Sequence, residues 1–292
     1  MANKKWDGTT YGNSLMHHWL IKLLKVIDIR IVYVFTSIFV IPPCLFRPGF
    51  KHIYSYFRTR WGFSPIKSFL KTYQNHCLFS QVVIDRFAMY AGKRFHFDIE
   101  GYEFFQQLAQ QEDAFIQLSS HIGNYELAGY SLESEGKPIN ALVFYGEKQS
   151  IMKNRSEMFA DKNIHMISVK DDMSHLFLID NALQKGEIVS MPADRIYGSS
   201  KSVSVKLLGA EVKLPLGPFK VPTMRGLHVL AVNVMKDSAK NYKIYVKPLD
   251  YDKQAPRKRQ IEQLAHGYVT ELERMLKMYP TQWYNFFDYW KS

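Results

Sequence analysis

Short apolar segments alternate with amphipathic segments along most of the chain after about residue 85. Apolar runs rich in β-branched residues and bounded by turn residues predict strands, and helical spacing between them predicts helices. The expected strands are 113–120, 139–146, 163–170, 187–194 and 228–236, and the expected helices are 149–161, 171–186 and 218–226. This order predicts an α/β fold with a mixed, mostly parallel sheet flanked by helices.

Further elements follow toward the C-terminus. Residues 202–215 and 241–249 alternate in the way of strands and are expected to pair partly antiparallel. Gly186 closes its predicted helix in a C-cap position. Residues 256–280 predict a long amphipathic helix that stops at Pro280.

The N-terminal region has a different pattern, with an uncharged apolar run of 16 residues from Ile31 to Phe46. A helix needs about 20 apolar residues to cross a bilayer, and the preceding segment adds charges. A cleaved signal peptide does not fit, because the run starts late and no small-residue cleavage site follows. We therefore expect a hydrophobic, membrane-anchoring helical region that is re-entrant or interfacial. A true span and a buried helix of a soluble domain remain alternatives.

The positive charge is concentrated in the same region. Residues 1–84 carry eleven Lys or Arg against two Asp, which is +9 of the net +11 of the chain. Basic residues interleaved with aromatic residues suit an anionic surface, and the adjoining apolar run favours a membrane over nucleic acid. We expect a basic, aromatic anchoring region at 1–84 and a catalytic domain at 85–292.

Several classes of function lack their signals. The chain has only 2 cysteines, Cys44 and Cys77, in no metal-ligand spacing, which argues against a disulfide framework and favours a reducing compartment. The sequence contains no glycine-rich phosphate loop, dinucleotide fingerprint or Gly-x-Ser-x-Gly nucleophile motif. We predict no metal and no cofactor. Ligands of open α/β sheets bind at the carboxyl ends of strands, where the polar segments 119–126 and 192–198 are expected.

The segment "QLSSHIGNYELAG", residues 117–129, carries the main candidate chemistry. In one regular helix His121 and Glu126 would lie about 140° apart and could not meet. A strand ending at Ser120, a turn at Gly123 and a helix starting near Asn124 would let Glu126 hydrogen-bond the His121 ring. The other ring nitrogen would then act as a base on a substrate hydroxyl. The alternative is an ordinary loop histidine beside a glutamate favoured by the helix dipole.

At these residues the sequence resembles a known family. The spacing of His121 and Glu126 resembles the histidine-acid motif of glycerolipid-type acyltransferases, in particular the bacterial lipid A late acyltransferases. "MPADRIYG", "LGAEVKLPLGPFKVPTMRGLHVLAVNV" and "YPTQWYNFFDYW" resemble further motifs of that family in the same order. The resemblance covers roughly residues 20 to 290.

The resemblance implies a glycerolipid acyltransferase-like fold and a protein of the bacterial inner membrane, with its catalytic domain on the cytoplasmic side. Such an enzyme moves a fatty acyl chain from an acyl carrier protein or coenzyme A thioester to a hydroxyl of a lipid acceptor. His121 would be the general base and Glu126 its orienting partner. The backbone amides of Gly123 and Asn124 would stabilise the oxyanion.

Other residues match the family's remaining motifs and are expected to bind substrate. The Arg195 guanidinium, next to Asp194, would bind an anionic head group or carrier phosphate, unless the two residues only form a local ion pair. Gly217 and Pro218 match a Pro-x-Gly-Pro turn that would shape the acyl or acceptor site, with a structural turn as the alternative. Arg155 matches no motif of the family and is a candidate for acceptor binding, with a solvated helix face as the alternative.

The C-terminus departs from the family pattern. Lipid A enzymes commonly carry a basic segment after the terminal tryptophan, whereas "NFFDYWKS" contains Asp288 and only Lys291. An aminolipid, glycolipid or polyene lipid acceptor therefore stands beside lipid A. Within other classes, a lipid or thioester hydrolase and a non-catalytic membrane-binding relative remain alternatives.

Overall fold

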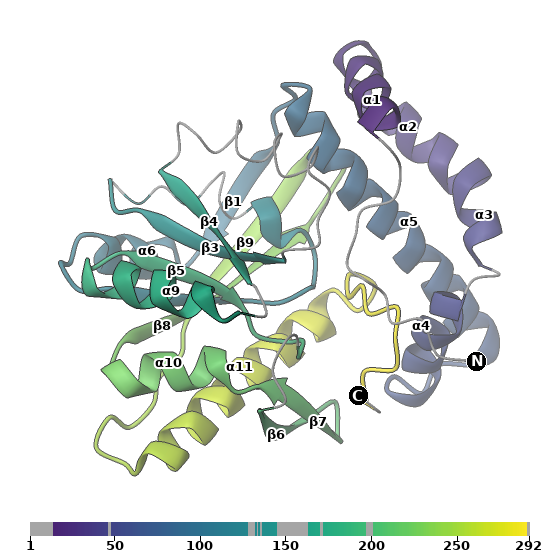
Figure 1. Ribbon diagram of the computed structural model, residues 1–292. Coiled ribbons are helices and arrows are strands. Elements are labelled where there is room, and N and C mark those ends of the chain that lie inside the picture. The colour runs from purple at the N-terminus through teal and green to yellow at the C-terminus, as the bar shows by residue number, and fades with distance from the viewer. Residues whose placement is uncertain are drawn as a thin grey trace.

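A computed structural model describes residues 14–45, 48–127, 132, 134, 136–144, 163–169, 172–196 and 201–290. In this part of the chain a seven-stranded sheet is flanked by helices, and a group of N-terminal helices packs beside it (Figure 1). The strands of the large sheet follow the order β1-β9-β8-β2-β5-β3-β4. The predicted α/β class with a mixed, mostly parallel sheet is confirmed.

The strands are β1 His96–Glu100, β2 Phe115–Ser119, β3 Ile139–Phe144, β4 Ile164–Val169, β5 Ile188–Pro192, β8 His228–Lys236 and β9 Asn241–Pro248. Neighbours pair in parallel except β8 with β9, which are antiparallel. A separate antiparallel hairpin consists of β6 Ser202–Leu207 and β7 Ala210–Pro215. The parallel strands β8, β2, β5, β3 and β4 therefore all end at the same edge.

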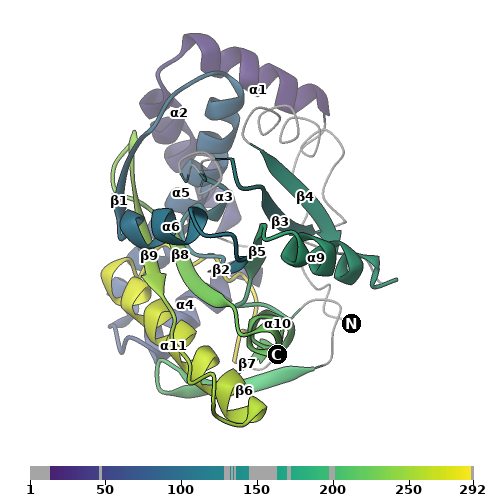
Figure 2. The same ribbon diagram turned by 90° about the vertical axis from the view of Figure 1, so that its left-hand side faces the viewer.

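Helices cover both faces of this sheet. The helices of the catalytic region are α6 Tyr102–Ala109, the 3-10 turn η2 Tyr125–Leu127, α9 Ser174–Gln184, α10 Gly217–Arg225 and α11 Arg257–Met278. One core forms where α9, α10 and α11 pack on the face of β2 that carries Ile116 and Leu118, and α4 contributes to it as well. The other core, under α6, contains Phe105 and Phe115. Figure 2 shows α10 and α11 together with the small hairpin on one side of the sheet.

The N-terminal helices form a layer of their own. They are α1 Ser14–Val26, α2 Ile29–Phe35, the π-helix η1 Thr36–Val40, α3 Ile41–Cys44, α4 Pro48–Thr59 and the long α5 Pro65–Tyr90. In Figure 1 α1 and α2 lie against α5 at the right of the sheet, and Leu24, Val32 and Phe87 share a small core between them. In the described residues we find no helix with the length and apolarity needed to cross a membrane.

Strand β1 and helix α6 were not predicted from the sequence, and helices α1, α4 and α5 were predicted only as part of an N-terminal helical region without bounds. Strand β1 has an alternating burial pattern but only five residues, and α6 is a short helix of eight. Helix α5 begins at Pro65 after a Ser64 cap and runs unbroken through residues 84 and 85, where the sequence predicts a domain boundary. The change in charge there lies inside a helix that joins the two regions. The expected helix at 149–161 falls outside the described residues.

Candidate active site

His121 and Asp194 meet because β2 and β5 are parallel neighbours in register. Ser119 pairs with Pro192, so the residues two positions beyond each strand end lie side by side. The His121 Nδ1 atom is 2.7 Å from Asp194 Oδ1, and the His121 backbone N–H donates to Asp194 Oδ2 over 2.9 Å. Both predicted polar segments therefore lie at the carboxyl edge of the sheet.

The turn after β2 has the predicted backbone. Gly123 has φ +55°, in the left-handed region, and a Cβ there would lie 2.0 Å from the Val234 carbonyl oxygen. Only glycine combines this dihedral with so close an approach to β8. The next residues form the short 3-10 helix η2 rather than an α-helix. The prediction of a glycine turn is confirmed.

The ring of His121 is largely neutral at pH 7. Burial lowers its pKa below the usual 6.5, and the nearby Arg195 charge acts in the same direction, against the opposing effects of Asp194 and Glu126. Burial alone would raise the pKa of Asp194, but its contacts with His121 and the charge of Arg195 outweigh this and hold it low. The charged Asp194 carboxylate accepts a hydrogen bond from Nδ1–H, which leaves Nε2 as the basic nitrogen. The His121 side chain is 22% exposed, against 0% for Asp194.

The structure corrects the predicted hydrogen-bond partner of the His121 ring. Asp194, expected to act with Arg195 on substrate, hydrogen-bonds Nδ1 in place of Glu126. Glu126 instead forms an ion pair of 2.8 Å with Arg86 of α5. The five-residue separation of His121 and Glu126 spans a tight turn and a 3-10 helix, and the strand register brings the other carboxylate closer.

Arg195 contacts the C-terminal segment. Its Nη2 donates to the Tyr284 carbonyl oxygen over 3.0 Å and to Asn285 Oδ1 over 2.9 Å, and its guanidinium carbon lies 5.3 Å from the Phe287 ring centre. These contacts hold the segment against the site. Binding of an anionic substrate group by Arg195 remains a prediction.

The predicted oxyanion donors are used elsewhere. The backbone N–H of Gly123 donates to the Gln282 carbonyl oxygen over 2.8 Å, and that of Asn124 donates to the Val234 carbonyl oxygen over 2.7 Å. A backbone N–H with its single hydrogen already donated cannot also bind an oxyanion at full strength. The backbone amides of Gly123 and Asn124 therefore fix the turn, and the prediction that they stabilise an oxyanion is corrected.

Gly217 and Pro218 begin α10. The next residue, Phe219, packs against Tyr268 with ring centres 5.6 Å apart, and the Tyr268 hydroxyl donates to the Ser119 carbonyl oxygen over 3.0 Å. The start of α10 is thereby tied to the end of β2, near His121. A substrate contact of Gly217 or Pro218 stays a prediction, and Arg155 lies outside the described residues.

The C-terminal segment is the part of the site that the sequence did not assign. The Tyr289 hydroxyl donates to the Asp194 backbone carbonyl over 2.7 Å, and Trp283 forms an isolated antiparallel bridge with Ile122. The density of aromatic residues at 283–290 was the available signal. Across the described residues, no group of three or more potential ligands could hold a metal ion.

Comparisons with known proteins identify the family of the chain. A family model described as bacterial lipid A biosynthesis acyltransferase matches residues 88–292. The crystal structure of the 1-acyl-sn-glycerophosphate acyltransferase PlsC from Thermotoga maritima aligns at 12% identity and a TM-score of 0.41, over 88% of this chain and 99% of that one. No curated protein matches the sequence. Because the family model covers well over half of the sequence, this chain belongs to the bacterial lipid A biosynthesis acyltransferase family and is an acyltransferase.

Proposed function

We propose that this acyltransferase moves a fatty acyl chain from an acyl thioester, carried by acyl carrier protein or coenzyme A, to a hydroxyl of a membrane lipid. The observation that carries the proposal is the His121 and Asp194 pair at the sheet edge, with Nδ1 and Oδ1 2.7 Å apart. An oriented neutral imidazole is the general base that such a reaction needs, and no nucleophilic residue of the enzyme is required.

The proposed reaction proceeds in two steps at the acyl carbon. His121 Nε2 takes the proton of the acceptor hydroxyl while its oxygen attacks the thioester carbonyl. The tetrahedral intermediate then expels the thiolate, the C–S bond breaks, and the imidazolium returns the proton to sulfur. The products are an ester and a free thiol. Asp194 keeps the Nδ1 proton in place and stabilises the imidazolium by its charge.

Glu126 supports this site from a second position. Its ion pair with Arg86 joins the short helix after the His121 turn to α5. We propose that Glu126 holds η2 in place and adds negative charge near the ring, since it raises the pKa of His121 against the effect of burial. This places its contribution below that of Asp194.

The surface of the N-terminal helices supports attachment to a membrane interface. Large apolar side chains of α1, α2 and η1 point to solvent, among them Trp19 at 60% and Phe39 at 64% exposure. Lys22, Lys25 and Arg30 lie among them and suit anionic head groups. An interfacial layer of this kind would bring the lipid acceptor to the site from the bilayer and leave the donor side to the aqueous phase. We propose the inner face of the bacterial inner membrane as the location.

The choice of acceptor follows from the family and from the C-terminal segment of the sequence. The family name points to lipid A, whereas the C-terminal segment lacks a basic cluster for a heavily phosphorylated sugar. We propose a lipid hydroxyl acceptor, with an aminolipid, glycolipid or polyene lipid as the alternatives to lipid A.

Mass spectrometry of total lipids from cells with and without the gene tests this proposal. We expect one lipid class to lose an acyl chain, and its mass to identify acceptor and chain length together. Purified protein in lipid vesicles, given an acyl thioester, should then form the same product. His121→Ala should reduce this rate about a hundredfold to ten-thousandfold. Release of free fatty acid with no acylated lipid would identify a hydrolase, and an unchanged rate in His121→Ala would reject the mechanism.

A further inference from the structure

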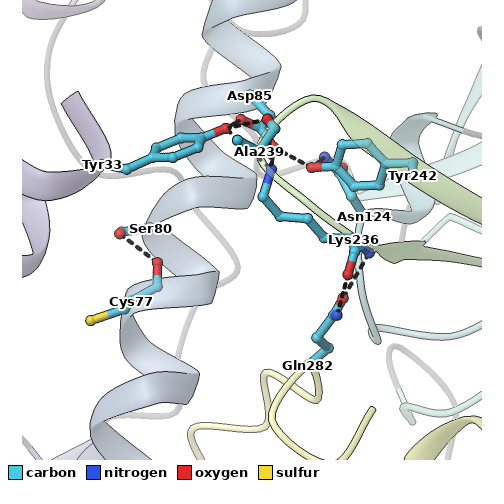
Figure 3. A network of polar contacts seen from close by, with 9 residues as sticks. All are labelled: Tyr33, Cys77, Ser80, Asp85, Asn124, Lys236, Ala239, Tyr242 and Gln282. Atoms are coloured by element: carbon cyan, nitrogen blue, oxygen red, sulfur yellow. Dashed lines mark hydrogen bonds and ion pairs between the residues drawn. The ribbon is translucent and has the colours of Figure 1, made fainter. Parts of the chain in front are cut away.

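A buried cluster of polar side chains lies beside the His121 turn without touching the reacting groups. At its centre Asp85 of α5 pairs with Lys236 of β8, with Nζ and Oδ2 2.5 Å apart and side chains 0% and 3% exposed. The hydroxyls of Tyr33 from α2 and Tyr242 from β9 also donate to the Asp85 carboxylate. Figure 3 shows these side chains converging from the N-terminal helices on one side and the sheet on the other.

Stability alone does not explain a buried ion pair of this kind. Removing two charges from water costs free energy that their attraction repays only in part, so an apolar replacement is often as stable. A buried ion pair does, however, impose a fixed geometry on the groups bonded to it. Two hydrogen-bonded connections lead from this cluster to the turn that carries His121.

The first connection runs through Tyr242. Burial raises the pKa of its phenol, which therefore keeps its hydrogen and donates it to Asp85. The lone pairs of the same oxygen accept from the Asn124 side-chain amide over 3.3 Å. Asn124 lies three residues after His121, and its backbone N–H donates to the Val234 carbonyl oxygen.

The second connection runs through Gln282. Its side chain forms two hydrogen bonds with the backbone of Lys236, accepting from the N–H over 2.9 Å and donating to the carbonyl over 2.7 Å. The Gln282 backbone carbonyl accepts from the Gly123 N–H over 2.8 Å. Figure 3 shows Lys236 between Asp85 and Gln282. Lys236 is thus bound to Asp85 through its side chain and to the His121 turn through Gln282.

We propose that Tyr242 and Gln282 are positioning residues for acyl transfer, which the buried Asp85 and Lys236 pair holds in place so that the turn keeps His121 on Asp194. The inference rests on the proposed role of His121 as general base. The two hydrogen bonds between His121 and Asp194 require the backbone and the ring of His121 to be placed together. Small displacements of a catalytic group cost large factors in rate, so groups that fix the turn contribute to kcat.

Two matched substitutions separate positioning from stability. Tyr242→Phe and Tyr33→Phe each remove one buried hydroxyl that donates to Asp85. The Tyr33 hydroxyl also accepts from Lys236 Nζ over 3.1 Å, and only the Tyr242 hydroxyl accepts from Asn124. We expect similar losses in melting temperature. Well below that temperature, Tyr242→Phe should lower kcat about tenfold with little change in KM for the thioester, while Tyr33→Phe stays within about twofold of the wild type.

Hydrogen exchange supplies a readout that needs no turnover. In Tyr242→Phe the amides of residues 120–127 should exchange at least about fivefold faster than in Tyr33→Phe. Adding Asn124→Ala to Tyr242→Phe should cause little further loss of kcat, because both variants lack the same hydrogen bond. Gln282→Ala should reproduce the faster exchange through the second connection.

Equal kcat or equal exchange in the two phenylalanine variants would overturn the proposal. Wild-type protein without acyl transfer, or a fully active His121→Ala, would instead refute the proposed function, and the exchange experiment would still decide whether the cluster holds the turn.

Discussion

Asp194→Asn is the sharpest test of the site, because the backbone around it dictates how an asparagine must sit. The Asp194 carboxylate accepts from the His121 N–H at one oxygen and from the ring at the other. An asparagine that keeps its oxygen on the backbone N–H presents its NH₂ group to Nδ1. The ring then has to carry its proton on Nε2, which is the nitrogen that serves as base.

The opposite orientation of the asparagine keeps the useful tautomer but places two donors against each other in a fully buried position. A buried unsatisfied donor costs about 1–3 kcal/mol, and loss of the charge facing the imidazolium adds about 1–1.5 kcal/mol in the transition state. Together these give about 2–4.5 kcal/mol, which corresponds to a fall in kcat of roughly 30-fold to 2,000-fold. The side chain keeps its size, so the fold should be retained.

The assay is transfer from a labelled acyl thioester to lipid in vesicles, with circular dichroism and melting temperature as controls for folding. Glu126→Gln is the matched comparison, since its carboxylate pairs with Arg86 and not with the ring. We expect it to lose no more than about tenfold in kcat, since glutamine keeps the size of the side chain and can still accept a hydrogen bond from Arg86. An Asp194→Asn enzyme within about threefold of the wild type, or a larger loss in Glu126→Gln, would refute the assignment of Asp194 as the orienting carboxylate.

Four further predictions follow from individual contacts. Burial lowers the pKa of His121 below 6.5, so kcat/KM should stay level near pH 7 and fall only as the pH drops through a midpoint below 6.5. A loss of activity centred above pH 7 would contradict the lowered pKa of His121. Gly123→Ala should lower the melting temperature by several degrees and abolish activity, because its Cβ would meet the Val234 carbonyl oxygen. As a control, Gly267→Ala within α11 should leave the melting temperature measured by calorimetry unchanged or raise it. Arg195→Ala should lower the melting temperature by a few degrees and speed hydrogen exchange at residues 282–290. Arg195→Lys should restore the melting temperature and the exchange rate only in part, since a single ammonium cannot reproduce the paired contacts with Tyr284 and Asn285. Unchanged exchange in Arg195→Ala would contradict this anchoring role. The double variant Trp19→Glu and Phe39→Glu should weaken binding to anionic vesicles at least tenfold in a flotation assay. The control Phe177→Glu lies on α9, across the molecule from α1 in Figure 1, and should bind as the wild type does. Equal binding by the wild type, the double variant and the control would argue against the N-terminal layer as the attachment surface.

The sequence alone determined the order of most strands and helices after residue 113, because apolar periodicity and capping residues are local properties. Strand β8, for example, was predicted with the bounds it has, and Gly123 was identified as a turn from its neighbours alone. The family motifs likewise singled out His121 and Asp194, although as members of separate groups.

Only the tertiary structure decided which groups act together. The sequence places Glu126 five residues from His121 and Asp194 seventy-three residues away, yet parallel pairing of β2 with β5 brings Asp194 to the ring. The partners of the Gly123 and Asn124 backbone amides are likewise set by the tertiary structure, because these N–H groups donate to the carbonyl oxygens of Gln282 and of Val234 in β8. Asp85, at a predicted boundary, became the centre of a buried cluster because α5 continues past it against the sheet. Register and packing join residues that are distant in the chain, and the local pattern of a sequence carries no direct record of those distances.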